Sequence, residues 1–226
     1  LKWRLGALGS FVVVSCAGAM DRKWVFGMPT KWQVTFGIFM ADEEKDASFM
    51  EVMMRDQKED IHIKDEAGNI VAKGSSKAMQ WTQSQDGEKV KDARTGEEIF
   101  STHRRSYFND YTRNVLRNGQ IIATVHEEIQ CGGPTLWMIS QGESLDAPLF
   151  TMARQGGWCG PPIDSILDPN EEEVGQVETI YHVTHRDEHE ITVEAGVNVA
   201  MIWALVICKS ALIQEQQQTS NSNNTY

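Results

Sequence analysis

One segment near the C-terminus, residues 193–213, is far more apolar than the rest of the chain and restricts what the protein can fold into. It reads VEAGVNVAMIWALVICKSALI. Fourteen uncharged residues separate Glu194 from Lys209, which is about 21 Å of helix, whereas the hydrocarbon core of a bilayer is about 30 Å thick. A helix that is apolar on all sides is either a membrane span or the centre of a protein core, and this length favours the core. The side chains predicted to form that core are Val197, Val199, Met201, Ile202, Leu205 and Val206.

Three stretches ahead of this segment repeat a β-hairpin pattern, in which a β-branched residue, a polar turn and an apolar run follow one another. Glycine supplies the positive φ that such turns need, and the turn glycines are Gly68, Gly96 and Gly119. A fourth, weaker unit turns at residues 168–173. Since no stretch before residue 190 shows a sustained helical period, we predict a mainly β (α+β) protein. Its antiparallel strands would close into a barrel or pack as two sheets, with the hydrophobic C-terminal helix filling the interior.

Composition excludes several classes of function. The formal net charge of −11 argues against nucleic-acid binding, which needs a basic face. The four cysteines form no CxxC pair and show no regular spacing, so the sequence predicts neither a zinc site nor a disulfide framework. The sequence contains no nucleophile elbow, catalytic triad or phosphate loop, and it places no activating base beside Cys131 or Cys159. We therefore expect a non-enzymatic protein without a cofactor.

The N-terminal residues carry two basic side chains ahead of a short apolar run, which is the layout of a secretory signal. Both a genuine signal or anchor and a misassigned gene start are compatible with this layout. We predict four regions: a hydrophobic leader (1–22), an N-terminal extension (23–44), a domain (45–213) and a disordered polar tail (214–226). The expected location is cytoplasmic or peripheral to a membrane, with a secreted or membrane-anchored protein as the alternative if the leader is a true signal.

Four motifs carry a resemblance to a known family. They are IKDEAGNIVAKG (63–74), VKDARTGEEIFSTHRR (90–105), VLRNGQIIATV (115–125) and ITVEAGVNVAMIWALVICKSAL (191–212). On these motifs the chain resembles the LURP-one-related proteins, of the Tubby C-terminal-like and phospholipid-scramblase-like superfamily. In the last motif Asn198 stands where the family usually has Asp, and Met201 stands where Leu is common. Asn and Asp are both good helix N-caps, so the first change is compatible with the same fold.

The resemblance implies a closed antiparallel barrel of about twelve strands around the C-terminal helix. It implies less about function, because members of the superfamily range from phosphoinositide-binding membrane tethers to proposed lipid scramblases and plant defence-associated proteins. We expect a non-enzymatic binding or scaffold protein that recognises anionic phospholipid headgroups or a protein partner. The alternative is a membrane-anchored, phospholipid-scramblase-like protein.

Between Ile99 and Ile122, four arginines accompany a single acidic residue, Asp110. Guanidinium groups bind phosphate bidentately, so this set is a candidate lipid-headgroup site. The simpler interpretation is a solvated strand face with carboxylate partners, because four arginines are at the low end for lipid-binding clusters. No position is carried over from the Tubby phosphoinositide motif, which does not align. The candidate residues are Arg104, Arg105, Arg113 and Arg117.

Three histidines, His182, His185 and His189, lie in the sequence YHVTHRDEHE. In an extended strand alternate residues share a side, so His182 and His185 would point in opposite directions. The sequence places no second pair of ligands near them, and a polar hairpin is the simpler interpretation. We therefore predict no metal site.

Overall fold

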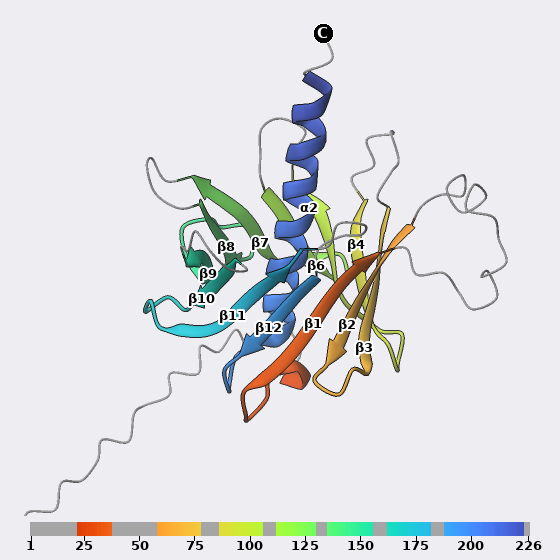
Figure 1. Cartoon of the computed structure of the whole chain (residues 1–226), viewed down its shortest axis with the longest axis vertical. Coiled ribbons are helices and arrows are strands. Elements are labelled where there is room, and N and C mark those ends of the chain that lie inside the picture. The colour runs from red at the N-terminus through yellow and green to blue at the C-terminus, as the bar shows by residue number, and fades with distance from the viewer. Residues whose placement is uncertain are drawn as a thin grey trace, which may run out of the picture.

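The computed structural model describes residues 22–37, 58–77, 86–105, 112–129, 135–155, 162–181 and 188–223. Within them, twelve strands form a closed antiparallel barrel around one long helix, α2 (Val199–Asn223), as Figure 1 shows. A 3-10 helix, η1 (Arg22–Trp24), precedes the first strand. The strands are β1 (Thr30–Gly37), β2 (Lys58–Asp65), β3 (Ile70–Lys77), β4 (Asp86–Asp92), β5 (Glu98–Arg104), β6 (Thr112–Arg117), β7 (Gln120–Ile129), β8 (Thr135–Gln141), β9 (Pro148–Gln155), β10 (Ile163–Leu167), β11 (Glu173–Ile180) and β12 (Glu188–Val193). The predicted barrel around a C-terminal helix is confirmed.

The first strand, β1, closes the barrel by pairing with both β2 and β12. Thr30 lies opposite Val193 on β12, and Trp32 lies opposite Asp65 on β2. Without β1 the sheet would have two unpaired edges, which proteins avoid exposing. The domain boundary predicted at residue 45 therefore falls inside the fold, because the N-terminal extension supplies the closing strand.

The two ends of the barrel differ, and we name them the base and the exit end. At the base, the chain enters α2, and five short turns connect the strands at residues 66–69, 93–97, 118–119, 142–147 and 168–172. Gly68, Gly96 and Gly119 occupy these turns with φ values of 82°, 74° and 77°, so the predicted hairpins turn where expected. At the exit end, α2 projects beyond the strands (Figure 1), and the connections between strands lie outside the described residues.

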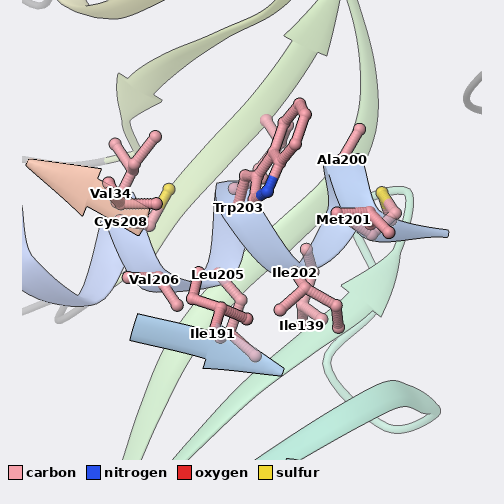
Figure 2. Packing of buried hydrophobic residues seen from close by; sticks show 14 of the residues in the cluster. Val34, Ile139, Ile191, Ala200, Met201, Ile202, Trp203, Leu205, Val206 and Cys208 are labelled. Atoms are coloured by element: carbon pink, nitrogen blue, oxygen red, sulfur yellow. The ribbon is translucent and has the colours of Figure 1, made fainter. Parts of the chain in front are cut away.

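The first ten residues of α2 form the centre of the core. Every residue from Val199 to Cys208 is at most 1% exposed. Figure 2 shows labelled side chains pointing to different sides of this helix, and Val34, Ile139 and Ile191 of the barrel wall belong to the same core cluster. The predicted core residues are thus buried, except Val197, which is half-buried just before the helix. Within the described residues, no helix combines the length and the apolar content needed to cross a membrane.

The start of α2 is fixed by a cap and by an aromatic layer. Asn198 Oδ1 accepts the N–H of Ala200 at 3.1 Å, which is the N-cap contact that the sequence predicts. In the first turns of the helix, the ring of Trp203 meets the rings of Trp24 and Trp32 edge-on, with centroid distances of 4.9 and 5.0 Å. The segment that contains η1 therefore packs against the start of the helix at the base.

The end of α2 departs from the sequence prediction. Residues 214–226 are predicted to be a disordered tail, but the helix continues to Asn223, so that prediction is wrong for residues 214–223. Two polar side chains hold this extension against the barrel wall. Gln216 donates to Glu127 Oε2 at 2.6 Å, and Glu215 pairs with Arg113. Residues 224–226 lie outside the described part of the chain.

Candidate functional site

The structure does not bring the four predicted arginines together. Arg104 and Arg113 face each other across β5 and β6 near the exit end, whereas Arg117 ends β6 at the base. Arg105 is exposed, and its Nη1 donates to the backbone carbonyl of Glu143 at 3.4 Å. The set therefore divides into separate places on the barrel.

Arg113 is a buried structural cation. Its side chain is 8% exposed, its Nη1 lies 2.5 Å from Glu88 Oε2, and its Nη2 pairs with Glu215. Burial alone would lower the pKa of Arg113, but the two carboxylates outweigh burial and raise it. Arg104 lies at the edge of the same group, with its Nε 3.7 Å from Glu215 and its side chain 39% exposed. Carboxylates hold both residues, but Arg113 is buried and does not lie on the solvated strand face of the simpler interpretation.

A second buried ion pair joins the helix to β10. Lys209 Nζ pairs with Asp164 Oδ2, and the two side chains are 7% and 3% exposed. Arg154 approaches the other oxygen of Asp164 at 3.4 Å. Burial lowers the pKa of Lys209, and the charge of Asp164 opposes that shift. This lysine interrupts the apolar segment and is satisfied inside the barrel.

Two potentially reactive groups beside these ion pairs are held in unreactive states. Burial raises the pKa of the Cys208 thiol, so it stays protonated at neutral pH. Burial, with the nearby charge of Lys209, lowers the pKa of His189 to about 4. The His189 ring nitrogens lie 3.2 Å from Thr179 Oγ1 and 2.9 Å from Ser210 Oγ. This geometry favours a structural role for both residues.

His182 and His185 lie outside the described residues, so the structure places only the third of the predicted histidines. Among the side chains that it does describe, no group of three or more His, Cys, Asp or Glu residues is arranged to hold a metal ion.

The base carries a cavity of about 320 Å³, which we call the base pocket. It lies between η1, the turn from β4 to β5 and the turn from β6 to β7, and an indole and charged groups of both signs line it. A volume near 300 Å³ is at the lower end for small-molecule sites, and suits one side chain of a partner or a small polar ligand. The lining residues are Lys23, Trp24, Asp92, Glu97, Glu98, Ile99, Arg117 and Asn118.

Asp92 is a polar group of the base pocket that several contacts hold in place. Lys23 Nζ pairs with its carboxylate, and the backbone N–H groups of Arg94 and Thr95 each donate to Oδ1 at 2.9 Å. The hydrogen bond from Lys23, together with those from the turn, lowers the pKa of Asp92 to about 2. This carboxylate is therefore ionised and held in one orientation at any physiological pH.

Two features of the sequence point to the pair between Lys209 and Asp164. Lys209 interrupts a run of apolar residues, which calls for a buried carboxylate, and Asp164 shares the inward face of β10 with Ile166. The base pocket gave no comparable signal, because Lys23 and Trp24 belong to an extension for which the family resemblance offered no support.

Comparison with known proteins identifies the family. The family model described as LURP-one-related matches residues 49–209, which is more than half of the chain, so the chain belongs to this family. The matched segment begins after β1, so η1 and the closing strand lie outside it. No curated protein and no solved structure matches the chain.

Proposed function

We propose that this member of the LURP-one-related family is a non-catalytic scaffold that recognises a protein partner at the base of its barrel. The interior supports this proposal because the protein's own helix fills it, with Val199 to Cys208 at most 1% exposed. No ligand could enter without displacing that helix. The buried ions pair with one another, and the thiol of Cys208 is protonated, so these groups suit stability and not turnover.

The base pocket is the observation that carries the proposal. It brings a tryptophan, an arginine and several carboxylates to one concave place, and aromatic residues and arginine are enriched where proteins bind proteins. The turns at 142–147 and 168–172 add five carboxylates and no Lys or Arg to the same end of the barrel. A protein with a net charge of −11 attracts basic partners over long range, so we expect a partner with a basic contact surface.

The test is affinity capture from cells that express the protein, comparing the wild-type chain with two charge-reversed variants. Glu97→Lys changes an exposed residue that lines the base pocket, and Glu128→Lys makes the same charge change on an exposed strand position at the exit end. We expect the specifically captured protein to be lost with Glu97→Lys and retained with Glu128→Lys. Equal capture by the wild type and both variants would refute docking at the base.

Recognition of anionic phospholipid headgroups is the second candidate function. One observation favours it, since Arg104 is 39% exposed and the neighbouring Arg105 is also exposed. Flotation with phosphoinositide-containing and phosphoinositide-free vesicles tests it. The expected result for this candidate is binding that needs the phosphoinositide and is weakened by Arg104→Ala and Arg105→Ala. Absent or unaffected binding removes the candidate.

A membrane-anchored, scramblase-like protein would need residues 195–213 to lie in lipid. In the structure most of this segment packs inside the barrel, and Lys209 within it pairs with Asp164 of the wall. Carbonate extraction tests the alternative. Retention in the membrane pellet by a chain without residues 1–22 would favour the anchored form over the scaffold.

A further inference from the structure

We propose that the base pocket recognises a primary ammonium group, the side-chain Nζ of a lysine carried by the partner, and that Lys23 occupies this position when the partner is absent. The inference rests on the proposed function, since it names the chemistry by which the base would recognise a protein. Two firmly held groups surround Lys23 Nζ, the carboxylate of Asp92 and the ring of Trp24.

The acceptor is oriented independently of its present ligand. Asp92 Oδ1 is fixed by the N–H groups of Arg94 and Thr95, both at 2.9 Å, and Lys23 pairs with the other oxygen, Oδ2. The Asp92 side chain is 7% exposed. A carboxylate that is largely withdrawn from water and held by its own turn needs a cation, whichever residue supplies it.

The second group is an aromatic ring. Lys23 Nζ lies 5.0 Å from the centroid of the Trp24 ring, which is within the range of a cation–π contact, and tryptophan is the best aromatic partner for a cation. Trp24 is itself held in place by Trp203, whose ring centroid is 4.9 Å away. A fixed carboxylate beside a fixed indole is a suitable arrangement for an ammonium ion, and Lys23 shows that the arrangement accepts one.

Lys23 is also replaceable. Its side chain is 42% exposed, so water can solvate its ammonium group when Lys23 leaves the carboxylate. Three carboxylates and two cations line the pocket, and once Lys23 withdraws only Arg117 opposes the carboxylates, which favours a cationic ligand over an anionic one. One carboxylate, that of Glu98, is already 2.6 Å from Lys89 Nζ outside the pocket. The cavity of about 320 Å³ leaves room for a partner's side chain to enter beside η1.

The experiment titrates the full chain with two peptides while the indole N–H signal of Trp24 is followed by ¹H–¹⁵N NMR. The peptides are acetyl-Gly-Lys-Gly-amide and its norleucine analogue, which keeps the aliphatic chain and lacks the ammonium. We expect the lysine peptide alone to shift the signal. In Lys23→Met the competing group is gone, so the lysine peptide should bind about two- to fivefold more tightly.

Two matched controls separate site chemistry from net charge. Lys31→Met removes one positive charge from an exposed position on β1 and should leave the affinity as in the wild type. Asp92→Asn keeps the oxygen that accepts the two N–H groups and removes the charge, so it should abolish the shift. Asp168 makes the same kind of turn contacts at the base, outside the pocket, and Asp168→Asn should have no effect.

An equal response to both peptides, or the same affinity in Lys23→Met and Lys31→Met, would overturn the ammonium site. The peptide comparison uses the wild-type chain, so it remains decisive even where a variant misfolds. If the ammonium site fails while capture still depends on Glu97, the scaffold function stands with a different recognition chemistry. If the lysine peptide binds and capture is insensitive to Glu97→Lys, the site stands and partner docking at the base fails.

Discussion

Replacing Lys209 with methionine isolates the contribution of the buried ion pair between α2 and β10. Methionine has similar length and fits an apolar core, so the change removes the charge and keeps most of the packing. What remains is the Asp164 carboxylate, whose side chain is 3% exposed. The variant therefore measures the cost of leaving that charge without its main partner.

The magnitude follows from the burial of both groups and from the one cation that stays nearby. Removing one member of a buried ion pair costs about 3–5 kcal/mol. Arg154 Nε, 3.4 Å from Asp164 Oδ1 on a half-exposed side chain, compensates part of this loss. We expect the free energy of unfolding to fall by about 3 kcal/mol, out of a total of about 5–15 kcal/mol for a typical domain. The double replacement Lys209→Met with Asp164→Leu leaves no unpaired buried carboxylate and should cost about 1 kcal/mol or less.

The assay is urea unfolding followed by tryptophan fluorescence, since Trp203 is fully buried and belongs to the same helix as Lys209. The exposed substitution Lys73→Met serves as the control and should change stability by less than about 0.5 kcal/mol. If Lys209→Met matches the wild type, or if the double variant is less stable than the single one, the pair does not form as described.

Four further predictions test the core, the pH dependence, the cap and the thiol. Ile202→Asp should abolish soluble expression, because an unpaired buried charge costs several kcal/mol, whereas Ile202→Val should cost only about 1 kcal/mol; a soluble, folded Asp variant would contradict the core assignment. The pKa of His189 is about 4 in the folded protein and about 6.5 in the unfolded chain. The stability that the neutral His189 ring contributes to the fold is therefore fully present above pH 6.5 and is lost as the pH falls toward 4. The free energy of unfolding should be lower by about 2 kcal/mol at pH 5, and His189→Gln should remove that part of the pH dependence measured by urea unfolding. Asn198→Ala should lower the free energy of unfolding by about 1 kcal/mol and Asn198→Asp should preserve it, with equal losses counting against the cap. Peptide mapping after thiol labelling should find Cys208 modified only in denaturant, and rapid labelling of the native protein would contradict its burial.

Local patterns in the sequence predict the parts of this fold that depend on neighbouring residues. The hairpin turns are predictable because Gly68, Gly96 and Gly119 each adopt a positive φ that other residues rarely adopt. The central helix is predictable because its sequence contains an uncharged run, residues 195–208, that is apolar on every side and too short to cross a bilayer. Both properties can be read from a few consecutive residues without knowledge of the rest of the chain.

Contacts between distant residues are harder to predict. Arg113 and Glu88 are 25 positions apart, and their pairing depends on the register of three strands. The arginine set looked continuous in sequence, yet a strand carries Arg113 inward near the exit end and Arg117 to the base. The base pocket depends on η1 crossing under the helix, which no local pattern of residues 22–29 predicts.

The polar contacts of α2 also bear on why the functional surface should be sought outside the barrel. Between residues 199 and 208 the helix is buried on all sides, so apolar packing alone gives little preference for one rotation over another. Directional contacts supply that preference, since Lys209 meets Asp164 on β10 and Glu215 meets Arg113 on β6. Fixing register is the best-attested use of buried polar groups, and these residues are committed to it. A ligand that bound Lys209, Asp164, Glu215 or Arg113 would break the contacts that hold the helix. Recognition at the base, where the helix is capped and the base pocket is open, leaves these contacts and the core intact.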